Sequence, residues 1–320
     1  MVKDPSVEAT PALSVVVATY NRSQVLRHAI RSVIESTCTD WELIIVGDAC
    51  TDDTGDCVAS FSDPRIRYVN LPVNCGDQSG PNNHGVSLAR GRYIAFLNHD
   101  DLYLRDHLET CVAALDGGGA DLVWAACAVA NPRAGDAPGE PPCTFTLEGV
   151  PAAHGYSPFA FYSASSWMFR RELTARVGPW PGVDRLYVTT SQAWLFRAWK
   201  AGASLQFLPK VGVLVVWSGT RAGSYAKPES PEHEALVRWM DEDAHARERI
   251  LEEAAVHAAM RQVTSAHHAP WTSITRAILH PIYTLMIKVG AHPRSLDMAV
   301  RYGRRGGFMR WHRRFTGLGS

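Results

Sequence analysis

The stretch Leu13–Arg22, LSVVVATYNR, sets the pattern for the chain. Its first six residues form a continuous apolar run rich in β-branched side chains, which predicts a strand buried on both faces. The polar residues TYNR follow at once and predict a turn. Residues 23–35 then place apolar side chains at helical spacing behind Ser23, a residue type that caps helices. The stretch therefore predicts a strand, a polar turn and a helix.

The same alternation continues through the first 130 residues. Apolar runs and helical spacing predict strands at 42–46, 66–71, 93–97 and 121–129, and helices at 51–61, 78–89 and 105–115. Strands that alternate with helices are typical of a doubly wound, mainly parallel sheet. We therefore predict an α/β fold.

Beyond residue 130 the pattern is less regular. It predicts an exposed loop at 131–143, a strand from Ser165 and a short helix ending near Gly178, a helix at 190–201, two strands within 205–217 and a long helical stretch at 231–266. We expect residues 1–130 and 131–230 to be two halves of one domain. Residues 231–320 are expected to form a helical C-terminal extension.

Composition and charge narrow the class of protein. With 46% hydrophobic residues, the 320-residue chain can bury a large core, which excludes wholesale disorder. Its 32 basic and 32 acidic side chains give zero net charge, which argues against a nucleic-acid binder. Seven cysteines without a C-x-x-C pair are typical of reduced thiols. Neither a signal peptide nor a membrane-spanning run is recognised, so we expect a cytoplasmic protein.

Three polar loops follow predicted strands, at residues 19–22, 47–53 and 98–101. In open α/β sheets, ligands bind in the crevice outside the carboxyl ends of the strands. Convergence of these loops would bring Asp48 close to the Asp100–Asp101 pair. The sequence therefore predicts one crevice lined by acidic side chains.

The residue types in this crevice favour a nucleoside diphosphate. Asp48 can accept an N–H of uracil, thymine or guanine, and Tyr20 offers a stacking face. The adjacent carboxylates of Asp100 and Asp101 favour Mg²⁺ or Mn²⁺, which commonly also binds a diphosphate. The simpler alternative for an Asp-Asp pair is a helix cap, the role that we assign to Asp52 and Asp53.

The ordered combination of these segments resembles family 2 glycosyltransferases with the GT-A fold. LSVVVATYNR matches the family's VxxxYN pattern, and Val46–Asp52 keeps the second acid of its Val-Asp-Asp-Gly-Ser-Thr-Asp pattern. Further matches are Asn74-Cys75-Gly76, Asn83-His84-Gly85 and the segment 91–97, GRYIAFL. The resemblance covers roughly residues 13–220 and is most specific over 13–115.

The resemblance implies a transfer of a sugar, with inversion, from a UDP, dTDP or GDP sugar to an acceptor hydroxyl. It implies that residues 1–130 bind the nucleotide sugar and that 131–230 form the acceptor side. Asp100 takes the place of the usual metal ligand, with Asp101 as its neighbour. The expected nucleotide-sugar site comprises Thr19, Tyr20, Asn21, Asp48, Gln78, Asn83, Asn98, His99 and Asp100.

One departure from the family concerns the general base. Family members generally carry Glu-Asp-x-Asp at the start of a later helix, where one acid deprotonates the acceptor. The matching residues 190–193 here read TSQA, so Ser191 and Ala193 fill the expected acidic positions. Serine is a poor base near pH 7, and alanine cannot act as one.

Three explanations of this departure remain open. The base can be another residue, with Asp184, His99 and His154 as candidates. The change, most suspiciously at Ala193, can be inactivating, whether natural or engineered. The chain can also be a silent protein that binds nucleotide sugars without turnover. We favour an enzyme of this family with an altered base position.

Other features of the sequence complete the prediction. Trp180 and Trp194 are expected on the acceptor side, and Trp180 is our choice to stack on a sugar. A sugar nucleotidyltransferase is disfavoured because no Gly-rich loop with Arg and Lys follows the first strand. A dehydrogenase is disfavoured because the G-x-G-x-x-G pattern is missing there. The acceptor can be a small molecule, a glycan or a lipid-linked sugar.

The zero net charge hides an uneven distribution. Residues 271–320 contain nine Lys or Arg and one acid, so this tail carries +8 and the first 270 residues carry −8. Apolar residues recur there at helical spacing: Ile274, Ile278, Ile282, Leu285, Met286 and Val289. The tail can lie on the anionic inner face of a membrane or meet a lipid-linked acceptor. It can equally fold onto the acidic body, and the sequence leaves both alternatives open.

Overall fold

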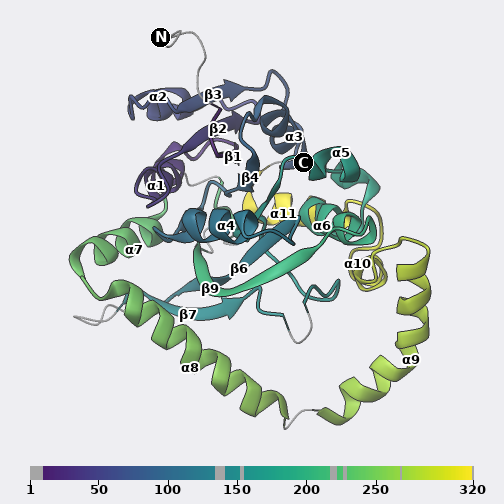
Figure 1. Ribbon diagram of the computed structural model, residues 1–320. Helices are drawn as coiled ribbons and strands as arrows, with labels where there is room; N and C mark the ends of the chain where they lie inside the picture. The colour runs from purple at the N-terminus through teal and green to yellow at the C-terminus, as the bar shows by residue number, and fades with distance from the viewer. Residues whose placement is uncertain are drawn as a thin grey trace.

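A computed structural model describes residues 10–133, 141–151, 155–216, 222–225, 229–266 and 269–318. Their strands form one nine-stranded sheet in the order β3-β2-β1-β4-β8-β6-β9-β5, with β7 paired to β6 (Figure 1). The predicted α/β class is confirmed. The sheet is parallel in its first half and mixed in its second.

The first half follows the predicted alternation. It consists of β1 (Leu13–Thr19), α1 (Ser23–Ile34), β2 (Trp41–Gly47), α2 (Thr54–Ala59), β3 (Ile66–Asn70), α3 (Ser79–Leu88) and β4 (Tyr93–Phe96). All four strands pair in parallel. The strand β1 is buried on both faces, as its apolar run predicts. Val15 and Val17 lie in one hydrophobic cluster with α1, and Val16 lies in another on the opposite face.

The second half contains β5 (Asp101–Tyr103), α4 (His107–Asp116), β6 (Leu122–Pro132), β7 (Cys143–Glu148), β8 (Trp167–Arg170), α5 (Leu173–Val177), α6 (Thr190–Lys200) and β9 (Leu205–Val216). Short 3₁₀ turns lie at Ala164–Ser166 and Val183–Arg185. Strand β8 is antiparallel to both β4 and β6, whereas β6 and β9 are parallel. This mixed pairing joins the two halves into one sheet.

Several predicted boundaries in this half are wrong. Residues 205–216 form one strand, because a register irregularity opposite Ala125–Cys127 lets β9 continue past Pro209. The predicted loop 131–143 ends in β7, which we did not predict, and β5 was also missed. Both missed strands are short or follow Pro-rich sequence, where periodicity gives little signal.

The predicted helical stretch 231–266 is two helices, α7 (Pro231–Glu242) and α8 (Ala246–Ala266). They separate at Asp243, whose carboxylate accepts a hydrogen bond from the backbone N–H of His245 at 2.8 Å. A side chain that bonds its own backbone two residues on competes with helix formation. This local turn explains the break.

The tail forms α9 (Ala269–Lys288), α10 (Arg294–Tyr302) and α11 (Gly307–Thr316). The first half of α8 packs on the sheet, where Ile250 and Ala254 are buried against β6 and β7. Figure 1 shows the chain leaving the sheet at the end of α8 and along α9, after which α10 and α11 return to the body. Backbone hydrogen bonds fix α11 there, from Gly223 N to Phe315 O at 2.8 Å and from Tyr225 N to Thr316 O at 2.9 Å. Within the described ranges, no helix has the length and hydrophobicity that crossing a membrane requires.

Candidate functional site

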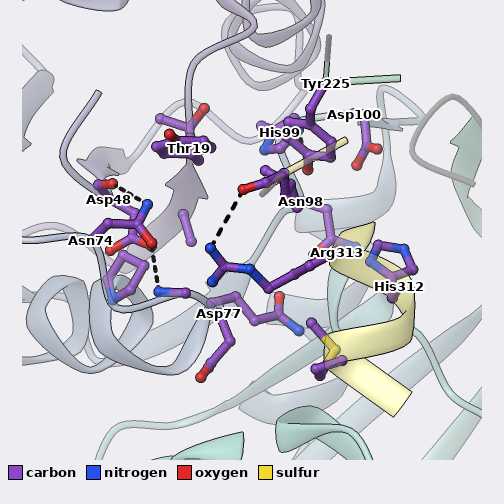
Figure 2. Close-up of a pocket in the computed structure, with 17 residues that line it drawn as sticks. Thr19, Asp48, Asn74, Asp77, Asn98, His99, Asp100, Tyr225, His312 and Arg313 are labelled. Carbon is purple, nitrogen blue, oxygen red and sulfur yellow. Dashed lines mark hydrogen bonds between the residues drawn. The ribbon is translucent and has the colours of Figure 1, made fainter. Parts of the chain in front are cut away.

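A cavity of about 220 Å³ opens at the carboxyl ends of β1, β2 and β4 (Figure 2). The three polar loops meet around it. Seven of the residues expected to bind the nucleotide sugar line its wall: Thr19, Tyr20, Asp48, Gln78, Asn98, His99 and Asp100. Asn21, Asn83 and Asp101 are not among the lining residues.

Asn21 lies outside the cavity wall and positions the loops that form it. It and Arg22 adopt left-handed backbone conformations, with φ of 53° and 64°, which turn the chain sharply at the end of β1. The Asn21 side-chain oxygen accepts a hydrogen bond from the backbone N–H of Thr51 at 2.9 Å. The structure therefore places Asn21 between the first two loops, where it holds the second loop to the first.

Asp48 is buried and rigidly held. Its carboxylate oxygens accept hydrogen bonds from the backbone N–H groups of Cys75 at 2.7 Å and Gly76 at 3.2 Å. The Asn74 side chain donates to the Asp48 carbonyl at 2.9 Å (Figure 2). A carboxylate has about four lone-pair sites, so Asp48 can still accept an N–H from a ligand in the cavity.

The adjacent acids Asp100 and Asp101 have different environments. Asp101 is buried in β5, where its carboxylate accepts hydrogen bonds from Asn98 Nδ2 at 2.8 Å and Ser165 Oγ at 2.5 Å. Burial and the Asp100 charge raise the pKa of Asp101 to about 8. Asp101 thus has a structural role, and a side-chain N–H of Asn98 is donated to this acid.

Asp100 faces the cavity, and one of its carboxylate oxygens lies 3.8 Å from Arg22 Nη1. Burial tends to raise the pKa of Asp100, but the charges of His99, Arg22 and His233 outweigh it and leave that pKa below its ordinary value. The carboxylate is therefore negative at neutral pH. An ionised acid at the cavity wall suits a cation or a hydrogen-bond donor.

The residues present fit a divalent cation that is shared with a ligand. In the described part of the chain, no three His, Cys, Asp or Glu side chains cluster closely enough to hold a metal by themselves. Mg²⁺, however, is usually held by one or two carboxylates together with substrate phosphates and water. Asp100 can supply that carboxylate, whereas Asp101 is turned toward Asn98 and Ser165.

One side of the cavity, which the sequence did not predict, is formed by residues near the C-terminal end of the described chain. Met309, His312 and Arg313 of α11 line the cavity together with Leu318. These three helix positions share one face at i, i+3 and i+4 spacing, which was a usable signal, but nothing in the sequence indicates what that face contacts. The tail thus closes the cavity opposite the polar loops (Figure 2).

Arg313 lies directly over the loop that Asp48 anchors. A Cβ atom added at Gly76 would collide with Arg313 Nη1, so the guanidinium rests on the Gly76 backbone. Its Nη2 also donates to the Leu318 carbonyl at 3.5 Å. The described lining residues include three carboxylates, those of Asp48, Asp77 and Asp100, and Arg313 is the one Lys or Arg among them.

His99 lines the cavity beneath the segment 222–225. Its Nε2 lies 3.5 Å from the Tyr225 hydroxyl, and burial lowers the pKa of His99. The Arg22 guanidinium lies 5.2 Å from the centre of the Tyr225 ring, within cation–π distance. These contacts place the His99 ring at the back of the site.

The expected base positions on α6 lie away from this cavity. Ser191 is buried behind the Thr189 cap, whose hydroxyl accepts a hydrogen bond from Gln192 N. Ala193 lines a second cavity of about 750 Å³. His154 lies outside the described residues.

Asp184 is exposed and lines a third cavity of about 280 Å³. This third cavity adjoins the first, because both are lined by the same four residues: Asn74, Gly76, Met309 and Arg313. Of the alternative bases that sequence analysis names, Asp184 and His99 are thus the two that lie in or beside the first cavity.

Trp180, which is predicted to stack on a sugar, is buried in the structure. Trp180 is 4% exposed, and its ring packs on Phe96 at 4.7 Å between ring centres. Trp194 is also buried, with its ring 6.3 Å from that of Trp180. Asn83 holds the Trp180 backbone by two hydrogen bonds, of 3.0 and 2.7 Å. All three residues therefore support the loop at 178–182.

Comparison with known proteins is consistent with this geometry. Residues 14–178, about half of the chain, match the family described as Glycosyl transferase family 2. One curated relative is the Escherichia coli UDP-Glc:alpha-D-GlcNAc-diphosphoundecaprenol beta-1,3-glucosyltransferase WfgD, 32% identical over 103 residues. That match covers 32% of this chain and 40% of the relative. The chain spans well under half the length of the first curated relatives that it matches.

Solved structures share the fold. Staphylococcus aureus TarS 1–349 in complex with UDP-GlcNAc has a TM-score of 0.53 at 19% identity, covering 64% of this chain and 58% of that 1–349 chain. The mannosyltransferase PcManGT from Pyrobaculum calidifontis, in complex with GDP-Man and Mn²⁺, has a TM-score of 0.50 at 16% identity. That match covers 95% of this chain and 92% of PcManGT. At these identities the likeness concerns the fold, which is the GT-A arrangement.

Proposed function

The chain belongs to glycosyl transferase family 2, and we propose that it transfers a sugar from a nucleoside diphosphate sugar to an acceptor hydroxyl with inversion. One observation carries the proposal. The ends of β1, β2 and β4 place Asp48 and Asp100 in the wall of one cavity, which Arg313 closes from the opposite side.

The donor would bind with its base at Asp48 and its diphosphate near Asp100 and Arg313. Asp48 would accept an N–H of the base, and Tyr20 would stack on the ring. Arg313 is suited to a diphosphate because its guanidinium donates in parallel to two oxygens. The nucleotide is UDP, dTDP or GDP, and the complexes of TarS with UDP-GlcNAc and of PcManGT with GDP-Man support this range.

A divalent cation, Mg²⁺ or Mn²⁺, would be held by Asp100 and would supply charge that stabilises the leaving diphosphate. The Mn²⁺ in the PcManGT complex supports this assignment. Without such charge, a diphosphate would meet three carboxylates and one guanidinium in the cavity wall. Arg313 then balances only part of the negative charge.

Asp184 is our choice as general base. It would accept the proton of the acceptor hydroxyl while the acceptor oxygen bonds to the sugar's anomeric carbon. The bond from that carbon to the diphosphate breaks on the opposite face, which inverts the configuration. The shared wall between the Asp184 cavity and the donor cavity supports this choice. Position 193, an acid in the family, holds Ala193 here.

The alternative function is nucleotide-sugar binding without turnover, which the missing acids at positions 191 and 193 favour. A sugar nucleotidyltransferase is the less favoured enzyme. We expect a cytoplasmic protein that contacts the inner membrane face through residues 271–320. The name of WfgD, which specifies a lipid diphosphate acceptor, supports a membrane-bound acceptor.

Nucleotide binding and turnover test the proposed function in sequence. UDP, dTDP or GDP, with Mg²⁺ or Mn²⁺, should raise the melting temperature of the full chain. The matching nucleotide sugar should then release its nucleotide. If no nucleotide stabilises the chain, the donor site is wrong; if one binds but no donor is turned over, the silent alternative is correct.

The base assignment has its own variants. General base catalysis contributes about 10²- to 10⁴-fold, so Asp184→Asn should lower kcat by that factor and leave nucleotide affinity unchanged. Because Asp184 is exposed, Asp184→Asn should not lower kcat through a folding defect. The melting temperature of the variant tests this. Full activity of Asp184→Asn would exclude Asp184, and a large gain from Ala193→Asp would identify a crippled family base instead.

A further inference from the structure

The second cavity, of about 750 Å³, lies between the body and the returning tail. Helix α6 and the segment 181–188 form one side, and the end of α9 and the start of α10 form the other (Figure 1). It is therefore built by the acceptor half of the sheet domain and the C-terminal extension together.

The charged residues of this cavity are all of one sign. Arg185, Arg197, Lys200 and Arg305 line it, and the described lining residues include no Asp or Glu. Across the described ranges none of these four cations forms an ion pair with a carboxylate. Four unneutralised cations around one hollow favour a ligand with several negative charges.

Arg197 adds a second indication of an anion. Burial lowers the pKa of its guanidinium, and its Nε is buried without a hydrogen-bond partner. Its Nη2 donates to the Pro179 carbonyl, so the side chain is held in place from the far end. A desolvated guanidinium without a carboxylate partner costs stability, and an anion bound in the adjoining cavity would offset that cost by Coulomb attraction.

The rest of the wall is apolar. Leu186, Val188, Phe196, Met286 and Leu296 contribute side chains to it. The apolar character continues onto the outer surface of the two tail helices. Leu285 of α9 and Val289, one residue past its end, are 62% and 72% exposed, and Val300 of α10 is 82% exposed. Each is one residue from a cavity-lining position, so exposed apolar side chains flank the cavity on the tail side.

We propose that this cavity binds the acceptor as a phosphate- or diphosphate-linked lipid. The four cations would hold the phosphate head, and the apolar wall would receive the first part of the hydrocarbon chain. The exposed side chains of α9 and α10 would lie toward the membrane that holds the remaining chain. This inference rests on the proposed function, since it names the acceptor class for that reaction.

The position of Asp184 fits such an acceptor. Asp184 lines the third cavity, and its neighbour Arg185 lines the second. In the same way, Gly306 lines the third cavity and its neighbour Arg305 lines the second. The backbone N–H of Gly306 donates to the Leu186 carbonyl at 2.6 Å, which ties the two segments together. A sugar linked to a phosphate in the second cavity would therefore extend past Asp184 toward the donor.

Direct binding of a soluble lipid diphosphate tests the proposal. Farnesyl diphosphate is titrated into the full chain, with farnesol and inorganic diphosphate as separate probes for the tail and the head alone. We expect farnesyl diphosphate to bind at least tenfold more tightly than either. Saturating UDP or GDP should not displace it.

The variants use exposed cations on the cavity wall. Arg185→Met and Arg305→Met should each weaken farnesyl diphosphate binding about tenfold, the loss expected for one charge-assisted contact. Arg304→Met is the matched control, since Arg304 is an exposed neighbour of Arg305 outside the cavity wall, and it should bind as the wild type does.

Three results would overturn the proposal. Displacement by UDP or GDP would place the probe in the donor cavity. Equal affinity for inorganic diphosphate would show a simple phosphate site. Equal losses in Arg304→Met and Arg305→Met would show nonspecific charge. Failure of the proposed function is a separate result, since it appears as a lack of stabilisation by any nucleotide.

Discussion

Strands β1, β2 and β4 and the terminal helix α11 line opposite sides of one cavity, and they are held in place differently. The strands are buried on both faces, so their polar ends are fixed by a hydrophobic core. Helix α11 is fixed by backbone hydrogen bonds to residues 223 and 225. Trp311 and Phe315 on this helix remain 47% and 41% exposed.

This difference separates two kinds of evidence about function. The polar loops carry the family's motifs, because binding a nucleoside diphosphate requires the same side chains in each member. The tail carries no motif, but it supplies Arg313 to the donor cavity and a cationic wall to the second cavity. We infer that the first half of the chain fixes the donor class and that the tail adapts the protein to its acceptor.

Breaking the core-supported wall should have the largest effect. Asp48→Asn replaces one of the two oxygens that accept from Cys75 and Gly76 with an NH₂ group, which faces a donor. Hydrogen bonds to charged groups contribute about 1.5–3 kcal/mol each, so nucleotide affinity should fall about 10- to 100-fold. Calorimetric titration with UDP or GDP measures it, and unchanged affinity would remove Asp48 from the donor site.

The fold of this wall could be predicted because burial leaves a strong sequence signal. The run LSVVVA and the polar residues after it locate both β1 and the crevice. The different positions of Asp100 and Asp101 could not be predicted, because Asp100 lies in a turn whereas Asp101 begins β5, a strand that the sequence did not predict. Only the partners Asn98 and Ser165 decide which acid faces the cavity.

Contacts between distant segments explain the other differences. Trp180 lies between two prolines, which predicts an exposed loop, yet its ring packs on Phe96 and Trp194. The tail was predicted to be helical and to carry both basic and apolar side chains, and α9 to α11 are helices. Its contact with the donor cavity depends on tertiary packing, for which the sequence of the tail holds no local signal.

The second-largest effect is expected on the free energy of unfolding, through the packing of α3 on β1 behind the same wall. A Cβ at Gly85 of α3 would collide with Val16 Cγ1 in β1, whereas a Cβ at Gly117 meets only ordinary contacts at 3.5 Å. Overpacking a core costs about 1–3 kcal/mol, so Gly85→Ala should lower the free energy of unfolding by that amount. Gly117→Ala is the control and should change it by less than about 0.5 kcal/mol. Equal values in urea unfolding would contradict close packing of α3 on β1.

The smallest effect concerns the exposed part of the tail. Val289→Ser, one residue past the end of α9, should reduce binding to anionic phosphatidylglycerol vesicles about two- to threefold, since one partly inserted side chain contributes less than its full burial value. Its effect on unfolding should stay below about 0.5 kcal/mol because the side chain is exposed. Val256→Ser on α8 is the control, as Val256 is 58% exposed but outside residues 271–320. Equal vesicle binding by both variants would contradict a membrane role for this part of the tail.

Truncation of the whole tail is unsuitable for this comparison. Removing residues 271–320 would also remove Met309, His312 and Arg313 from the donor cavity. A loss of activity would then have two causes. Single substitutions separate the donor-side contacts of the tail from its outer surface.

The most direct test of the two-walled donor site uses two adjacent arginines of α11. Arg313 lines the cavity, whereas Arg314 is exposed and outside its wall. Affinities for the nucleoside diphosphate that stabilises the wild type, and for the corresponding nucleoside, are measured for Arg313→Met and Arg314→Met. Arg313→Met should weaken diphosphate binding at least about tenfold, leave nucleoside binding within twofold and keep the melting temperature. Equal diphosphate affinity in the two variants, or an equal loss for the nucleoside, would contradict a donor site completed by the tail.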